Sequence, residues 1–178
     1  NTIGPVLGKQ LLSSSVLALT VSFAAVALYI SARYARLYAA LALLALAHDV
    51  LITSGLFAWL GLFAGVEVNS LFAVALLTLA GYSVNDTVVV FDRIREYFTL
   101  YGSKKDRKEV FNLALNSTLS RTINTSLSTF VVLLTIFLFG GDNIKGFVFA
   151  LMIGVVVGTY SSIFIATPTV VDLSREKA

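Results

Sequence analysis

The chain has 178 residues, of which 57% are hydrophobic and 13% charged, and its formal net charge is +3. Its mean hydropathy is +0.88. A soluble domain is about half apolar and a quarter charged, so this composition indicates a membrane protein. The sequence has no cysteine, which excludes disulfides and thiolate metal sites. The basic residues fall in short segments beside apolar runs, a pattern that fits an anionic membrane surface and excludes nucleic acid as a partner.

Five apolar stretches reach the ~20 residues that a membrane-crossing helix needs. Backbone groups in lipid need partners within their own segment, so each stretch is predicted to be a helix. The predicted spans are 13–34, 37–63, 68–91, 116–139 and 146–166. The predicted fold is therefore an all-α, polytopic transmembrane helix bundle that forms one domain.

The longest connection, residues 92–115, carries most of the basic residues. Apolar and aromatic side chains recur at helical spacing from Ile94 to Tyr101, which predicts an amphipathic extension lying at the membrane interface. Gly102 would end it. Ser103 and Asp106 then resemble a capping box that opens a second short helix. The aromatic side chains are expected to pack on the bundle rather than bind a cofactor.

The lysines and arginines also predict the orientation of the chain, because cytoplasmic segments carry an excess of them. One side of the membrane receives Arg33, Arg36, Arg93, Arg95, Lys104, Lys105, Arg107, Lys108, Arg175 and Lys177, and the other receives Lys9 and Lys145. The C-terminus is therefore expected in the cytoplasm and the N-terminus outside. The chain starts at Asn1 without a methionine or a signal pattern. We therefore expect that an earlier span and an external domain precede it in the whole protein.

Three charged residues lie well inside the predicted spans: Asp49, Asp86 and Arg121. Each costs at least ~2.5–3.5 kcal/mol at the centre of a bilayer, so each is a candidate functional residue. Asp86 and Arg121 lie on consecutive antiparallel spans, each roughly 8 Å from the cytoplasmic end, and are predicted to be partners. They could form a structural ion pair, although desolvation makes a static pair a costly way to join helices.

Polar side chains follow one face of the fourth predicted span and also surround Asp86 on the third. Serine and threonine at helix interfaces often serve only packing and hydrogen bonding. A polar face this wide could instead admit water and conduct protons. The predicted proton pathway consists of Asp49, Asn85, Asp86, Arg121 and Asn124, with Ser83, Ser117, Thr125 and Ser128 as a supporting polar face.

Other features of the sequence have simpler interpretations. His48 could relay protons beside Asp49, although a neutral, hydrogen-bonded core histidine is the more ordinary role. A single histidine without cysteine predicts no metal site, and no strained serine turn indicates a hydrolase. Gly154 and Gly158 form a small-residue motif for close helix packing. Pro168 is predicted to end or kink the last span.

Four motifs carry a resemblance to a known family. They are AHDVLIT at 47–53, GYSVNDTVVVFDRIRE at 81–96, NSTLSRTINTSLST at 116–129 and GTYSS at 158–162. With them, nearly the whole chain resembles the C-terminal five-span part of the SecF-type proteins. These belong to the SecD/SecF family of bacterial protein-export membrane proteins, in the resistance-nodulation-division superfamily. A SecF-type half has six spans, so the resemblance also implies a missing first span and external domain.

The resemblance implies a non-enzymatic subunit without cofactor in the bacterial cytoplasmic (inner) membrane. It implies that the proton-motive force promotes preprotein translocation after the SecA-driven steps. The implied partners are SecD, separate or fused, the SecYEG translocon and SecA, with YidC and YajC as further candidates. In this family, the residues that match Asp86 and Arg121 belong to the proton pathway. Three alternatives remain open: a proton-coupled exporter of small molecules or lipids from the same superfamily, a non-pumping structural subunit, and a membrane-embedded hydrolase.

Overall fold

The computed structural model describes residues 5–66, 68–102 and 104–175, and in these residues it contains helices and no strands. The helices are α1 (Pro5–Arg33), α2 (Arg36–Ala64), α3 (Ser70–Tyr101), α4 (Arg107–Phe139), α5 (Asp142–Ser161), a π-helical turn η1 (Ser162–Ala166) and α6 (Thr167–Arg175). In the described part of the chain, five helical segments are long and apolar enough to cross a membrane, the fifth running through α5, η1 and α6. The predicted helical membrane bundle is confirmed, and each predicted span overlaps one of these helical segments.

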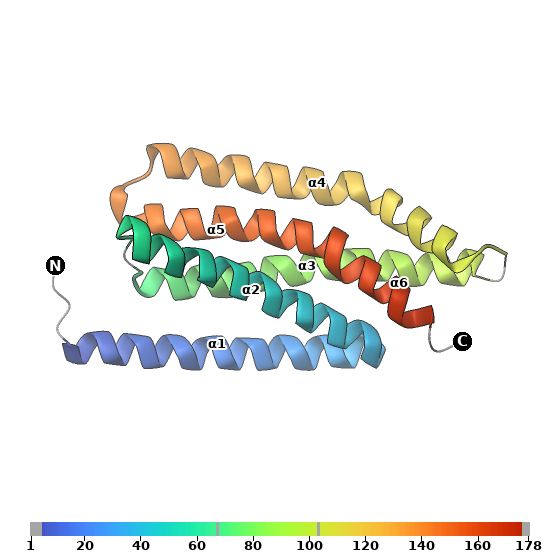
Figure 1. The fold of residues 1–178 in the computed structure, drawn as a ribbon, viewed down its shortest axis with the longest axis horizontal. Coiled ribbons are helices and arrows are strands. Elements are labelled where there is room, and N and C mark those ends of the chain that lie inside the picture. The colour runs from blue at the N-terminus through green and yellow to red at the C-terminus, as the bar shows by residue number, and fades with distance from the viewer. Residues whose placement is uncertain (1–4, 67, 103, 176–178) are drawn as a thin grey trace.

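Helix α3 lies at the centre of the bundle and contacts α1, α2, α4 and α5. The helices run side by side along one long axis, with α4 at one edge and α1 at the other (Figure 1). Helix α1 packs mainly on α2 and α3 and leaves large apolar side chains such as Leu17 and Leu28 exposed. An apolar surface of this kind suits contact with lipid.

The helices alternate between two ends of the bundle, which we name for their residues. The basic end holds the α1–α2 turn, the α3–α4 turn and α6. The glycine end holds the α2–α3 and α4–α5 turns, with Gly65 and Gly140. Gly65 ends α2 in the left-handed conformation, with φ 66°, and its N–H donates to the carbonyl oxygen of Leu60. Glycine adopts that backbone without steric cost.

The connection predicted for residues 92–115 is much shorter in the structure. Helix α3 continues without a break to Tyr101, and α4 already begins at Arg107. The extensions pack on each other instead of lying along the interface: the rings of Phe98 and Phe111 meet edge to face, 4.8 Å apart, and Ile94 is fully buried. This mutual burial carries both helices past the predicted spans. The expected aromatic packing on the bundle is confirmed for Tyr97 and Phe98, whereas Tyr101 is exposed.

The predicted capping box of Ser103 and Asp106 can be checked only at Asp106. Ser103 lies outside the described residues, and Asp106 precedes α4 in extended conformation without a side-chain capping bond. Its backbone carbonyl accepts from Val110 N–H.

The last span does not end at Pro168. Its hydrogen-bond pattern changes from α to π before the proline. Proline lacks an N–H and its ring clashes with the carbonyl four residues earlier, here that of Phe164. That residue lies within η1, where the helix widens to π geometry. The Thr167 hydroxyl donates to the carbonyl oxygen of Ser162 at 2.8 Å. The helix then resumes as α6, so Pro168 perturbs the span without stopping it.

Gly154 and Gly158 bring α5 close to α3, which confirms the predicted packing motif. A Cβ atom at Gly154 would lie 2.5 Å from Leu79 Cδ1. A Cβ atom at Gly158 would lie 3.3 Å from Ser83 Cβ and 3.6 Å from Asp49 Oδ2. The close approach places the polar residues after Gly158 against the polar residues of α2 and α3.

Candidate functional site

Asp49 lies at the centre of a first polar cluster, the Asp49 cluster, with His48, Ser83 and Ser161. Its side chain is 0% exposed. The hydroxyls of Ser83 and Ser161 donate to Oδ2, at 2.5 Å and 2.8 Å, and His48 Nδ1 lies 3.0 Å from Oδ1. The carboxyl group therefore joins α2, α3 and α5, and both of its oxygens have partners.

Asp86 lies in a second cluster, the Asp86 cluster, with Tyr82, Ser126 and Thr159. Asp86 is 3% exposed, and the Ser126 hydroxyl donates to its Oδ2 at 3.5 Å. Ser126 Oγ also lies 2.6 Å from Thr159 Oγ1 and accepts from the Tyr82 hydroxyl at 3.1 Å. One serine of α4 thus connects the carboxyl group of α3 to a hydroxyl of α5.

Hydroxyl groups also lie between the two clusters. The hydroxyls of Thr87 and Ser162 are 3.0 Å apart, and Thr87 donates to the carbonyl oxygen of Ser83 at 3.2 Å. Ser83 and Asp86 are three residues apart on α3, or about 4.5 Å along the axis. Asp49 contacts Ser83, so the Asp86 carboxyl group lies closer to the basic end than that of Asp49, by about this distance.

Arg121 does not contact Asp86. It is exposed and lines a cleft of about 370 Å³ at the basic side of the Asp86 cluster. The cleft lies between α3 and α4 and is bounded by Val89, Asp92, Arg93, Glu96, Ser117, Thr118 and Arg121. Among the described residues no ion pair joins Arg121 to a carboxylate.

The register of α3 and α4 explains why the predicted ion-pair contact is not formed. Phe98 faces Phe111 across the two antiparallel helices. Counting ten residues along both helices from this contact places Arg121 opposite Val88 rather than Asp86. The sequence-based estimate of equal depth was therefore wrong by about two residues, or roughly 3 Å along the axis.

The structure places the other predicted site residues in two groups. Ser83 lies in the Asp49 cluster, as a direct partner of the carboxyl group. The remaining predicted residues are exposed on the described chain and belong to neither cluster: Asn85, Ser117, Asn124, Thr125 and Ser128. The predicted polar face of α4 is therefore not the face that enters the bundle.

The face of α4 that does enter the bundle carries Thr118, Thr122 and Ser126, one turn apart. None of these three residues is among the predicted site residues. Neither are Thr159, Ser161 and Ser162, although the motif at 158–162 contains all three. Their clue was position: they directly follow the glycine that closes the α3–α5 distance.

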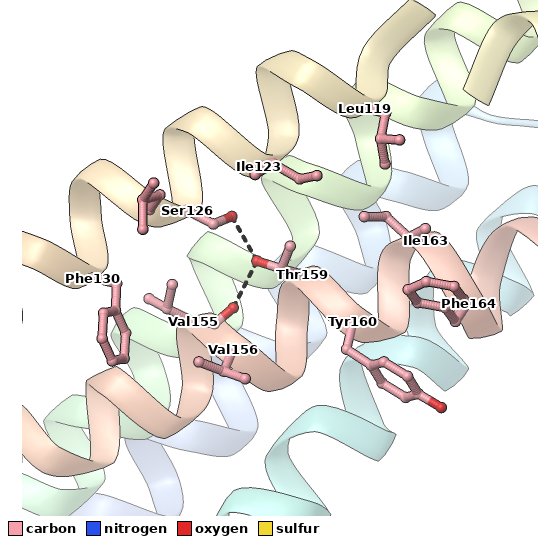
Figure 2. A pocket seen from close by; sticks show the side chains of 11 residues that line it. Leu119, Ile123, Ser126, Phe130, Val155, Val156, Thr159, Tyr160, Ile163 and Phe164 are labelled. Atoms are coloured by element: carbon pink, nitrogen blue, oxygen red, sulfur yellow. Dashed lines mark hydrogen bonds between the residues drawn. The ribbon is translucent and has the colours of Figure 1, made fainter. Parts of the chain in front are cut away.

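An apolar groove of about 540 Å³ runs between α4 and α5 on the other side of the Asp86 cluster. Figure 2 shows Ser126 and Thr159 hydrogen-bonded to each other between the two helices, with Leu119, Ile123 and Phe130 along α4. The hydroxyl groups of the wall are thus engaged with each other. The groove offers an apolar ligand little beyond hydrophobic contact, so the chemistry lies inside the bundle.

Carboxyl and hydroxyl groups at these distances are suited to proton transfer. A hydroxyl both donates and accepts a hydrogen bond, and a carboxyl group binds or releases a proton. Within the described ranges no three histidine, cysteine, aspartate or glutamate side chains converge as metal ligands would. Two buried acids whose side-chain contacts bring together four helices, α2 to α5, are instead typical of a proton pathway.

Comparisons with known proteins agree with this architecture. Residues 1–176 match the family described as protein export membrane protein SecD/SecF, C-terminal. The chain belongs to the SecD/SecF family. It is 51% identical over 175 residues to the protein translocase subunit SecF of Prochlorococcus marinus, covering 98% of this chain and 54% of that relative. It is 53% identical over 167 residues to the same subunit of Synechocystis, covering 94% and 53%.

Solved structures of the SecD/SecF family share the fold. The crystal structure of SecDF from Thermus thermophilus, described as a translocon-associated membrane protein, superposes with a TM-score of 0.87 at 36% identity. The match covers 99% of this chain and 24% of that chain. SecDF in its super-membrane-facing form gives a TM-score of 0.84 at 36% identity, over 98% of this chain and 23% of that one. The predicted family is confirmed, and the chain spans about half the length of the curated relatives that it matches.

Proposed function

We propose that this chain is the C-terminal membrane part of a SecF subunit that helps preproteins cross the bacterial cytoplasmic membrane. In this proposal the proton-motive force promotes preprotein translocation, and the protons pass through the Asp49 and Asp86 clusters. Relatives named protein translocase subunit SecF support the export task. SecDF structures support SecD, separate or fused, as the direct partner. The SecYEG translocon, SecA, YidC and YajC complete the proposed surroundings.

The observation that carries the proton-driven role is the burial of two carboxyl groups at the centre of a membrane bundle. Asp49 is 0% and Asp86 is 3% exposed, and their partners are hydroxyl groups and one imidazole rather than a fixed cation. A buried acid costs at least ~2.5–3.5 kcal/mol on insertion scales. A bundle held only by packing would be more stable with apolar residues there, so these acids are proposed to bind and release protons.

Asp86 and Arg121 provide the proposed switch. A guanidinium in contact favours the ionised carboxylate, whereas burial without one favours the neutral acid. In this structure the two residues are apart, because Arg121 is exposed on α4 while Asp86 is buried, and a rotation of α4 is proposed to bring them together. A proton that falls through ~100 mV supplies ~2.3 kcal/mol, enough to bias such a movement roughly fifty-fold. In the proposal, an external domain of the whole protein would convert the movement into a pull on the preprotein.

The proposed orientation places the basic end in the cytoplasm and the N-terminus of this chain outside. The lysine and arginine distribution supports it. The cleft beside Arg121 then opens toward the cytoplasm and would receive the released proton.

The test compares Asp86→Asn with Asp142→Asn in the full-length protein together with its SecD partner. Asp142 is highly exposed and pairs only with Lys145, which makes it a matched control. Both complexes are reconstituted with the translocon in vesicles, and preprotein translocation is measured with and without a proton gradient. The amide that replaces the Asp86 carboxyl group cannot carry a proton, so the gradient should no longer stimulate translocation, while Asp142→Asn should respond like the wild type. Full stimulation in Asp86→Asn would exclude Asp86 as the carrier.

A further inference from the structure

Two buried threonine hydroxyls near the carboxyl clusters have no protein partner. Among the described side chains, the buried polar atoms without a hydrogen bond are Thr53 Oγ1, Thr122 Oγ1 and the Tyr34 hydroxyl. Other threonines of the bundle, such as Thr135, donate to the carbonyl four residues earlier. Thr53 is 0% and Thr122 is 2% exposed. A buried polar group without a protein partner is normally paired with an internal water molecule.

The two hydroxyls flank the two carboxyl clusters along the bundle. Thr53 follows Asp49 by four residues on α2, so it lies on the same helix face, one turn closer to the glycine end. Thr122 precedes Ser126 by four residues on α4 and lies one turn closer to the basic end. The order from the glycine end to the basic end is therefore Thr53, Asp49, Asp86 and Thr122.

We propose that Thr53 and Thr122 each bind an internal water molecule, and that these two waters extend the proton pathway beyond Asp49 and beyond Asp86. The inference rests on the proposed proton-driven function and adds the two ends of the proton pathway. A hydronium ion beside Thr53 gives its proton to the Asp49 carboxylate and becomes water. The proton then passes from the Asp49 acid to the Asp86 carboxylate, as the proposed function requires. On the other side, the Asp86 acid gives it to the water beside Thr122, which leaves as hydronium. Each threonine hydroxyl orients its water and stays chemically unchanged.

The surroundings of the two threonines differ, and the difference assigns a state to this structure. Beyond Thr53, Phe57 is buried with its ring 4.8 Å from that of Phe72 and 5.9 Å from that of Phe149. This aromatic cluster is apolar and would interrupt a water chain. Beyond Thr122 lies the polar cleft with Arg121. The proposed pathway is thus open toward the basic end and closed toward the glycine end.

His48 is the competing route out of the Asp49 cluster. Its side chain is 34% exposed and is the one member of that cluster that reaches the bundle surface. A proton could then leave Asp49 sideways, through the imidazole, without any water at Thr53. The experiment therefore includes a variant at this position.

The test measures gradient-driven proton uptake into vesicles that contain the full-length protein with SecD, using a pH-sensitive dye. Thr53→Val and Thr122→Val keep the size but remove the hydroxyl, and each should lower uptake about fivefold, the equivalent of one hydrogen bond of ~1 kcal/mol. Thr53→Ser and Thr122→Ser keep the hydroxyl and should restore uptake. Thr135→Val, at an exposed position whose hydroxyl serves only its own helix, should match the wild type.

Reference variants separate the possible failures. If Asp86→Asn stops uptake while the valine variants match Thr135→Val, the water inference fails and the proposed function stands. If Asp86→Asn leaves uptake unchanged, both fail. Loss of uptake in His48→Phe together with normal uptake in Thr53→Val would show that protons pass through the His48 imidazole and not past Thr53. A structure of the whole protein that resolves water should show density within hydrogen-bond distance of both hydroxyls, and hydroxyls bonded to helix carbonyls instead would overturn the inference.

Discussion

Replacement of Asp49 separates a structural role from a proton-carrying role, because its three contacts are known. Asp49→Ala removes the acceptor of the Ser83 and Ser161 hydroxyls and the partner of His48. Two of the three contacts, to Ser83 and Ser161, join helices, and hydrogen bonds between membrane helices contribute ~0.6 kcal/mol each on average, so the two amount to roughly 1.2 kcal/mol. A change of this size shifts the folding equilibrium roughly eightfold. We therefore expect Asp49→Ala to lower the abundance and the melting temperature of the full-length protein.

Asp49→Asn should behave differently. The amide keeps one carbonyl oxygen for the two serine hydroxyls, and its N–H can donate to the imidazole, so the three helices stay joined. Abundance should remain close to that of the wild type. The amide cannot bind and release a proton, however, so gradient-stimulated preprotein translocation should fall.

The assay determines both quantities in the same membranes. Full-length chain is quantified by immunoblot, its melting is followed in detergent, and translocation is measured at a fixed proton-motive force. If the translocation defect of Asp49→Asn disappears after correction for abundance, Asp49 only holds helices together. If Asp49→Ala melts like the wild type, the three contacts do not stabilise the bundle and the energetic argument is wrong.

Three further outcomes are expected. Cysteines at Asp106 and Gly141 should react with a membrane-impermeant reagent from opposite sides of the membrane, and labelling from one side would contradict the topology. Gly154→Ala should destabilise the protein because its Cβ would lie 2.5 Å from Leu79 Cδ1, and Leu79→Ala in the same chain should recover part of the melting temperature; no recovery would exclude this clash as the cause. Arg121→Leu removes an exposed side chain that forms no ion pair with a carboxylate among the described residues, so the free energy of unfolding should change by less than about 0.5 kcal/mol. Gradient-stimulated translocation should be lost, and retained stimulation would exclude Arg121 from the switch.

The fold was largely predictable because lipid imposes strong limits on sequence. Long apolar runs can satisfy their backbone only as helices, so all five spans were found. The ends were harder. The amphipathic spacing from Ile94 to Tyr101 was read as a surface helix, whereas Phe98 packs on Phe111 and makes it part of α3. Sequence alone does not say whether the apolar face of an amphipathic helix lies on the membrane surface or packs on a neighbouring helix.

The candidate site was predictable in its acids and not in its partners. Asp49 and Asp86 stand out because carboxyl groups are rare in membrane spans. On α4, however, the row through Arg121 and the row through Thr122 differ by one residue, or about 100° of rotation. The expected pairing with Asp86 favoured the wrong row. The correct one depends on how α4 packs against α3 and α5, and no local pattern in the sequence contains that information.

The π-helical turn η1 makes the last membrane helix a jointed element. It follows directly after Ser161, whose hydroxyl donates to Asp49, and it precedes α6 at the basic end. A π turn closes its hydrogen bonds over five residues instead of four, so it holds one residue more than an α-helix requires. Return to α geometry would rotate Thr167–Arg175 by about 100° and advance it by about 1.5 Å relative to Ser161. A small rearrangement around the Asp49 carboxyl group can thereby rotate α6 at the basic end of the bundle, while the helix stays continuous.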